Sequence, residues 1–331
     1  MSCRLPLALA VGRYDRVQAL LDGRVRPEGI DLTCLALGAE ETFFRMLRHR
    51  EFDVAEMSLS SYVLSLLTPE RPFVAIPVFP SRAFRHSSIY VNADSGIERP
   101  SDLRGRLVGT PEYQISAGVW IRGTLAEHHG VPVESVRYRT GGQHQANRPE
   151  KISLSLPPEI DVQPIGPGQT LSAMLDSGEI DAFYTARMPH SFCRPGSRVR
   201  RLFPDYEQVE RDYYARTRIF PIMHTVVLRR EVYERHRWVA QSLMQAFAAA
   251  QRETYERLYD TTALATMLPW AVGELERTRA LMGGDFWPYG LEANRSTLST
   301  FLRYSYEQHL ASRVLEPEEL FVPETLEAHA I

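Results

Sequence analysis

The sequence predicts an α/β protein of two lobes, each a mostly parallel sheet flanked by helices, with two strands crossing between the lobes. Three observations support this. The chain has 331 residues, which is enough for about two domains. Short apolar runs alternate with helical patterns from the N-terminus, as in βαβ units. A second stretch of the same alternation begins near residue 92, and the helical patterns after residue 238 are best packed against the first lobe.

In the first lobe we expect strands over residues 5–11, 30–35 and 52–57, and helices over 14–21 and 42–49. Ligands of such sheets bind beyond the carboxyl ends of the strands. The loops over 12–15 and 58–61 would lie there.

In the second lobe we expect a strand over 106–109, a helix over 116–128 that stops at Gly130, mostly loops over 141–168, and a helix-to-strand step over 171–184. Apolar spacing predicts further helices over 238–258 and after Asn294. The predicted domains are therefore 1–90 plus 225–331 and 91–224. The crossing strands would lie near 79–92 and 219–228, with the ligand cleft between the lobes.

Charge and hydropathy exclude several classes of partner. The 38 basic and 41 acidic residues give a net charge of −3, which does not suit nucleic-acid binding. No stretch approaches the roughly 18 apolar residues of a membrane span. The run Leu5–Val11 reads as a buried strand rather than a secretion signal. Three cysteines without a CxxC pair fit a reducing compartment, so we expect a cytoplasmic protein.

The basic residues are unusual, because Lys151 is the only lysine and the other 37 are arginines. Lys151 lies in a polar stretch next to prolines, so we set aside Schiff-base and pyridoxal phosphate chemistry. Arginine instead binds carboxylates through two parallel hydrogen bonds. The chain has no HExxH and no P-loop ending. We therefore predict no cofactor and no metal site, although a substrate with adjacent oxygens could recruit a divalent ion.

Five segments carry a family resemblance: FDVAEMSLSSY (52–62), FPSRAFRH (79–86), GTPEYQISAGVWIRGTL (109–125), FPIMHT (220–225) and WPYGLEANR (287–295). Through them the chain resembles the 4,5-dihydroxyphthalate decarboxylases, which have a type II periplasmic-binding-protein-like fold. The resemblance implies removal of one carboxyl group from 4,5-dihydroxyphthalate, giving 3,4-dihydroxybenzoate (protocatechuate) in phthalate degradation. The alternative is a solute-binding protein or sensor that only binds an aromatic acid.

Such a decarboxylation needs a proton for the ring carbon that loses its carboxylate, a clamp for the retained carboxylate, and groups that bind the hydroxyls. Histidine is the natural acid near neutral pH. Both His86 and His224 fall in the predicted crossing segments, so we expect one of them to donate the proton. Asp15 and Glu112 are candidates for accepting a phenol proton.

Substrate binding is predicted for residues in the resembling segments and at strand ends. The guanidinium candidates are Arg13, Arg82, Arg85 and Arg187, which suit a doubly negative ligand. The remaining candidates are Tyr14, Ser60, Tyr113, Ser116, Tyr289 and Asn294. The expected partner is thus a small aromatic carboxylate, and a homo-oligomer is compatible with the sequence.

Overall fold

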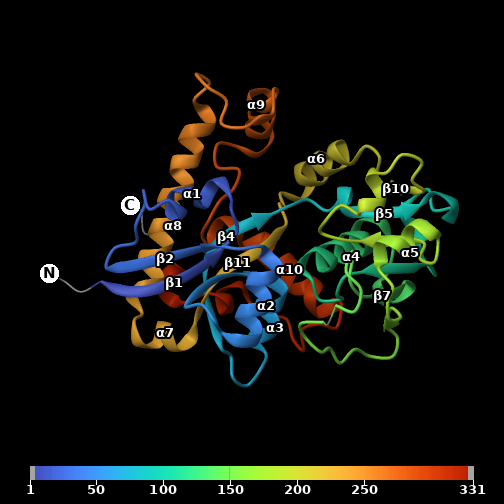
Figure 1. Cartoon of the computed structure of the whole chain (residues 1–331), viewed down its shortest axis with the longest axis horizontal. Helices are drawn as coiled ribbons and strands as arrows, with labels where there is room; N and C mark the ends of the chain where they lie inside the picture. The colour runs from blue at the N-terminus through green and yellow to red at the C-terminus, as the bar shows by residue number, and fades with distance from the viewer. Residues whose placement is uncertain (1–3, 149, 327–331) are drawn as a thin grey trace. The chain divides into compact units, whose positions relative to one another are not determined.

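The computed structural model describes residues 4–148 and 150–326 and divides into two compact units (Figure 1). Of the described residues, unit 1 comprises 4–82, 224–298 and 315–326. Unit 2 comprises 83–148, 150–223 and 299–314. The chain passes between the units at residues 82/83, 223/224, 298/299 and 314/315, and the first two of these points lie inside the predicted crossing segments. Residues 83–90 and 299–314 belong to unit 2, whereas the sequence placed them in the first domain, and residue 224 belongs to unit 1 instead of the second domain.

Unit 1 is built on a five-stranded sheet of order β2-β1-β3-β11-β4. β1 is parallel to β2 and β3, and β11 runs antiparallel to β3. The strands are β1 (Leu5–Val11), β2 (Ile30–Ala36), β3 (Val54–Ser58), β4 (Phe73–Arg82) and β11 (Ile222–Arg229). The helices are α1 (Asp15–Leu21), α2 (Ala39–His49), α3 (Leu59–Leu66), α7 (Arg230–Arg235), α8 (Trp238–Tyr259) and α9 (Ala271–Met282).

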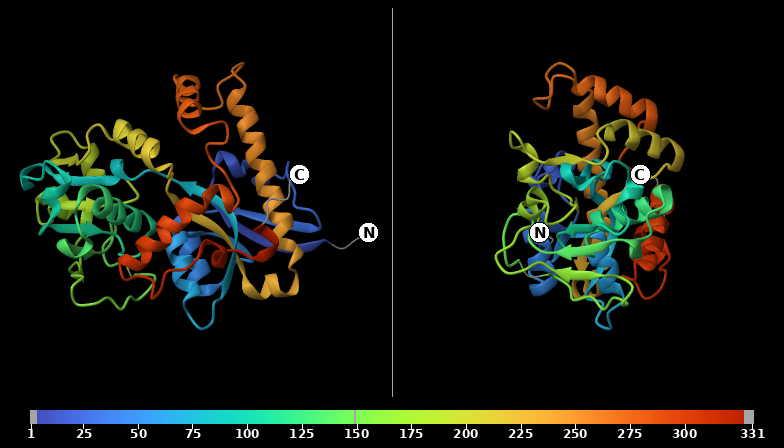
Figure 2. Two further views of the ribbon diagram at one scale, coloured as in Figure 1. Left: turned by 180° about the vertical axis from the view of Figure 1, so that it is seen from behind. Right: turned by 90° about the vertical axis from the view of Figure 1, so that its right-hand side faces the viewer.

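The main core of unit 1 lies between one face of this sheet and helices α1, α7 and α8. Alternate strand residues such as Leu9, Val54 and Val226 point into it, because side chains alternate between the faces of a strand. The helix α8 contributes Val239, Leu243, Phe247 and Ala250, the spacing that the sequence predicted. Figure 2 shows α8 running past the sheet toward α9, which has no buried residue.

Unit 2 contains a six-stranded sheet of order β10-β5-β9-β6-β7-β8. Only β5 is antiparallel to its neighbours, β9 and β10. The strands are β5 (Ile89–Asn92), β6 (Leu107–Thr110), β7 (Arg137–Thr140), β8 (Val162–Pro164), β9 (Ala182–Tyr184) and β10 (Val199–Arg201). The helices are α4 (Ser116–His129), α5 (Leu171–Ser177) and α6 (Tyr206–Thr217).

The helix α10 (Arg295–Glu307) belongs to both units, since the chain passes into unit 2 after Leu298. Its second half packs on α4: the ring centroids of Phe301 and Tyr304 lie 5.5 and 5.7 Å from that of Trp120. Among the described residues no helix is long and apolar enough to cross a membrane. Cys34 and Cys193 are free thiols, and Cys3 lies outside the described residues.

Candidate functional site

The polar site of unit 1 lies where β3 ends and β11 begins. These strands are paired so that His224 is opposite Ser58 and Val226 is opposite Glu56. Val54 and Val226 face the core; Glu56 lies two residues after Val54 on β3, and His224 lies two residues before Val226 on the antiparallel β11. They therefore share that face at the edge of the sheet where β1 and β3 end. Glu56 and His224 thus stand where the pattern of apolar side chains on this face would continue, at the edge of the sheet where α/β proteins usually bind ligands.

Glu56 is the centre of a hydrogen-bond network. Its Oε1 lies 2.5 Å from His224 Nδ1 and accepts a 2.9 Å hydrogen bond from the Tyr14 hydroxyl. Its Oε2 accepts a 2.9 Å hydrogen bond from the backbone N–H of Gly12. Burial of the side chain, which is 0% exposed, opposes its ionisation. The contacts with His224, Gly12 and Tyr14 outweigh this and hold the pKa of Glu56 below its usual value.

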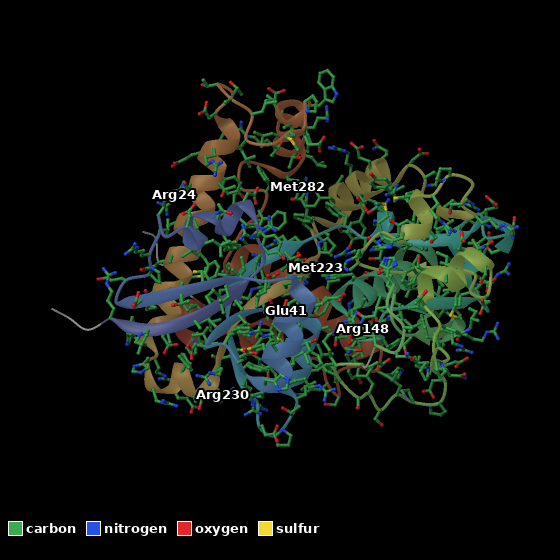
Figure 3. All side chains as sticks on the ribbon, viewed as in Figure 1. Arg24, Glu41, Arg148, Met223, Arg230 and Met282 are labelled. Carbon is green, nitrogen blue, oxygen red and sulfur yellow. The ribbon has the colours of Figure 1, made fainter. Side chains whose placement is uncertain are left out.

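The network fixes the orientation of the His224 ring. Nδ1 faces Glu56, and the edge of Phe43 packs on the imidazole with centroids 4.8 Å apart. The side chain of His224 is 17% exposed, so the ring is held but accessible. Figure 3 labels Met223, the residue immediately before it on β11. A carboxylate on Nδ1 leaves Nε2 as the nitrogen that can exchange a proton with a ligand.

The sequence analysis identified Tyr14 and His224 as candidates but missed Glu56 and Arg16. Tyr14 contacts both missed residues: its hydroxyl donates a hydrogen bond to Glu56, and its ring centroid lies 4.3 Å from the Arg16 guanidinium carbon. The sequence did contain a signal for Glu56, namely an acid inside a short strand of otherwise apolar and small residues. Such an acid has to be satisfied by partners once the strand is buried.

The other candidates in unit 1 are less directly placed. Arg13 and Asp15 are exposed, and Asp15 pairs with Arg16 at 3.0 Å. Ser60 is fully buried in the first turn of α3. The buried Tyr289 hydroxyl has no hydrogen-bond partner among the described residues.

Arg82 and Asn294 anchor a chain segment rather than facing an open site. Arg82 Nη2 donates to the Pro288 carbonyl at 2.6 Å and to Asn294 Oδ1. Asn294 Nδ2 donates to the carbonyls of Pro288 (3.0 Å) and Gly290 (2.8 Å). Both ends of the Asn294 amide are used inside the protein. Arg82 and Asn294 therefore hold the segment over 288–290 at the end of β4, and their predicted contact with substrate stays a prediction.

In unit 2, His86 is buried among rings. Its centroid lies 5.4 Å from those of Phe203 and Tyr213 and 6.2 Å from that of His129. Burial, followed by the nearby His129, His128 and Arg216, lowers the pKa of His86 to about 4. A histidine that is neutral and packed at pH 7 does not suit the predicted role of proton donor. This leaves His224 as the better placed of the two histidines.

Glu112 and Lys151 form a buried ion pair in unit 2. Glu112 Oε1 contacts Lys151 Nζ and accepts a 3.1 Å hydrogen bond from Arg148 Nη2, and Gln114 Nε2 donates to Oε2 at 2.6 Å. The Lys151 side chain is 6% exposed, so its polar surroundings in the sequence were misleading. Glu112 is therefore engaged in hydrogen bonds and ion pairs inside the protein, and its role as acceptor of a phenol proton stays a prediction.

The remaining candidates of unit 2 are dispersed. Tyr113 is buried, and its hydroxyl donates to the Gln308 carbonyl at 3.3 Å. Ser116 is buried at the start of α4. Arg85 donates to Met223 Sδ (3.2 Å) and the Ala186 carbonyl (3.3 Å), whereas Arg187 is exposed.

A cavity of about 640 Å³ lies within unit 2, next to Tyr113 and Arg148 and the ends of β7 and β8. Within residues 4–148 and 150–326, no three His, Cys, Asp or Glu side chains are grouped to hold a metal ion.

The architecture is that of a periplasmic-binding-protein-like α/β fold. Solved structures of this kind superpose on nearly the whole chain. One is the periplasmic aliphatic sulphonate binding protein of Escherichia coli, with a TM-score of 0.54, 15% identity, and 96% of this chain and 97% of the other covered. Another is a Candida albicans protein with the generic periplasmic binding protein fold, with a TM-score of 0.52, 9% identity and 98% of both chains covered. These similarities establish the fold.

Closer relatives define the family. The chain is 42% identical over 328 residues to a 4,5-dihydroxyphthalate decarboxylase of Comamonas testosteroni, with 99% of both chains covered. It is 43% identical over 211 residues to a protein of the same name from Pseudomonas putida, covering 64% of this chain and 82% of the relative. No family model matches the chain. The chain belongs to the 4,5-dihydroxyphthalate decarboxylase family.

Proposed function

We propose that this protein is a carboxy-lyase that converts 4,5-dihydroxyphthalate to 3,4-dihydroxybenzoate and carbon dioxide, with His224 as the proton donor and no cofactor. Membership of the family supports the reaction. The observation that carries the residue assignment is the Glu56–His224 pair, in which a buried carboxylate holds one imidazole nitrogen and leaves the other for a ligand.

The substrate can supply its own electron sink. Each of its hydroxyls is para to a carboxylate-bearing carbon, so it can push electron density toward that carbon. His224 Nε2 delivers a proton there while the para hydroxyl loses one. The bond to the carboxylate then breaks, its electron pair restores the aromatic ring, carbon dioxide leaves, and the phenol takes back a proton. The net change is one proton consumed and one carbon dioxide released, which requires no pyridoxal, thiamine or flavin.

Glu56 supports the imidazole through the cycle. It keeps a proton on Nδ1 and stabilises the imidazolium that exists before transfer, as the buried acid of a catalytic triad does. Location in the cytoplasm is part of the proposal, and the free thiols of Cys34 and Cys193 fit a reducing compartment.

The test is release of carbon dioxide from 4,5-dihydroxyphthalate by purified protein without added cofactor, measured with and without a metal chelator. We expect turnover in both conditions and 3,4-dihydroxybenzoate as product. His224→Ala should lower kcat by about 10²-fold or more, the usual contribution of a positioned acid. His49→Ala, at an exposed position on α2, is the matched control and should retain wild-type kcat.

Tight binding of 4,5-dihydroxyphthalate without turnover in both conditions would contradict the proposal and favour the solute-binding alternative. Activity that disappears with chelator and returns with a divalent ion would overturn only the cofactor-free part. An unchanged kcat in His224→Ala would remove His224 from the role of proton donor.

A further inference from the structure

Arg16 is held in an unusually fixed position. Its guanidinium carbon lies 4.3 Å from the ring centroid of Tyr14 and 4.2 Å from that of Trp287, so it contacts two aromatic rings. Its Nε donates to the Pro80 carbonyl at 2.6 Å. These contacts come from β4, the loop after β1 and the segment before α10, all within unit 1. The Arg16 side chain is 17% exposed, so these contacts hold it in place although it is not completely buried.

The guanidinium retains donors for a ligand. An arginine side chain has five N–H donors. One is used on Pro80 and one on Asp15 Oδ1, which lies 3.0 Å from Nη1. The other three have no hydrogen-bond partner among the described residues. Asp15 is 58% exposed, so water screens its negative charge. Arg82, in contrast, is buried and donates to Asn294 and Pro288.

Arg16 is linked to the proposed proton donor through a chain of contacts. The ring of Tyr14 lies against the guanidinium, and its hydroxyl donates a hydrogen bond to Glu56 Oε1. Glu56 in turn contacts His224. One tyrosine therefore links a cation and a proton-transfer pair at the same edge of the sheet.

A second group points to a ligand in this region. The Tyr289 hydroxyl is buried and has no partner among the described residues, which is uncommon in folded proteins unless a ligand or water completes the bond. Burial raises the pKa of Tyr289, and the positive charges of Arg16 and Arg82 act in the opposite direction.

We propose that Arg16 binds the carboxylate that the substrate retains, and that it makes the enzyme select dianionic over monoanionic aromatic acids. The inference rests on the proposed function for the identity of the substrate, but not for the presence of an anion site. The two rings and the Pro80 carbonyl hold the guanidinium in place, so little side-chain entropy is lost when a carboxylate forms two parallel hydrogen bonds. Lysine at this position would keep the charge but lose both the fork and the stacking.

The test compares Arg16→Gln and Arg16→Lys with wild type, and uses Arg26→Gln, at an exposed arginine of the same unit, as control. Binding is measured calorimetrically with phthalate, a dianion, and benzoate, a monoanion, both of which lack the hydroxyls needed for turnover. We expect wild type to prefer phthalate, Arg16→Gln to lose this preference, and Arg16→Lys to retain part of it. For 4,5-dihydroxyphthalate, KM should rise at least about tenfold in Arg16→Gln, the scale of a charge-assisted hydrogen bond, with a smaller change in kcat. Arg26→Gln should match wild type.

Equal phthalate affinity in wild type and Arg16→Gln would overturn the proposal, as would wild-type protein that binds phthalate no better than benzoate. If Arg16→Gln does not fold, judged by circular dichroism, Arg16→Lys decides the question through the same two ligands. The two proposals fail separately. A wild-type protein without turnover whose phthalate preference depends on Arg16 would refute the decarboxylase but not the clamp, whereas active protein with an unaltered Arg16→Gln would refute the clamp alone.

Discussion

At the scale of single residues, Glu56 determines what His224 can do. Three donors converge on one fully buried carboxylate, which makes the charged form the stable one despite the cost of burial. The lowered pKa of Glu56 also makes the stability of the folded protein depend on pH. Because the folded-state pKa of Glu56 is lowered, its contribution to stability is complete at neutral pH and is lost as pH falls through that lowered value. At neutral pH the imidazole therefore always has a charged partner on Nδ1.

Glu56→Gln tests this role with almost no change in volume. The amide keeps a polar group beside His224 but has no charge, and it can present N–H where Oε1 accepted. We expect kcat to fall by about 10²-fold or more, by analogy with the neutral replacement of a triad acid, with KM changed little. Nitrogen NMR should show less of the tautomer protonated on Nδ1. Tyr14→Phe removes one of the three donors and should have a smaller effect on kcat.

A change of kcat below twofold in Glu56→Gln, with the His224 tautomer unaltered, would show that the carboxylate does not position the imidazole. A loss of stability without any change in tautomer would assign Glu56 to folding instead.

Sequence patterns located part of this site for a physical reason. Strand ends and family-like segments can be recognised locally; Tyr14 was found at a strand end, and His224 was found in a predicted crossing segment that resembles the family. The partner of a buried group cannot be recognised locally: Glu56 and His224 are 168 positions apart, and only strand pairing brings them together. Lys151 is a second example. Its polar neighbours in the chain indicated an exposed position, and nothing local indicated its salt bridge to Glu112, 39 positions away.

At the scale of elements, the packing of α10 on α4 depends on a glycine. A Cβ on Gly123 would lie only 2.1 to 2.4 Å from ring atoms of Tyr304. The Tyr304 ring is buried, packs against Trp120 and hydrogen-bonds to Glu127 through its hydroxyl, so it is constrained from several sides. The close approach of the two helices therefore requires the absence of a side chain at residue 123.

Gly123→Ala should lower the free energy of unfolding by about 1–3 kcal/mol, the usual cost of overpacking, even though alanine favours helix. Gly273→Ala in α9 is the matched control, because its nearest neighbouring atom would be Arg277 Nη1 at 3.6 Å. That variant should be neutral or stabilising by up to about 1 kcal/mol. Urea unfolding midpoints measure both. A Gly123→Ala protein as stable as wild type would mean that Tyr304 can move away freely.

The same helix explains the main difference between predicted and observed domains. Apolar spacing correctly indicates that Leu298, Phe301 and Leu302 are buried. It does not say against which element they pack, because an apolar stripe fits any apolar surface of suitable shape. Residues 299–314 in fact pack in unit 2, where Trp120 and Tyr113 offer aromatic partners. Strand order was predictable only as far as βαβ succession determines it, because β5 and β11 each pair antiparallel with strands that are distant in the sequence.

At the scale of the whole molecule, His86 couples folding to pH. Its pKa is about 4 in the folded protein and 6.5 as the reference for an unconstrained histidine. Between these values the unfolded chain binds more protons than the folded one, so stability rises with pH there and is lost as pH falls. His128 and His129 also have lowered pKa values, mainly through burial, and act in the same direction. We therefore expect the protein to be less stable at pH 5 than at pH 7.

The contribution of His86 alone is on the order of 2 kcal/mol between pH 7 and pH 5, from the linkage of its two pKa values. His86→Phe should remove this part while keeping an aromatic ring against Phe203 and Tyr213. Urea unfolding at several pH values measures the slope in both proteins, and the difference between the slopes isolates His86 from the other titrating groups. If the variant lost as much stability as wild type over this range, the imidazole would have to be charged in the folded protein. A charged imidazole here would reopen the possibility that His86, rather than His224, delivers the proton.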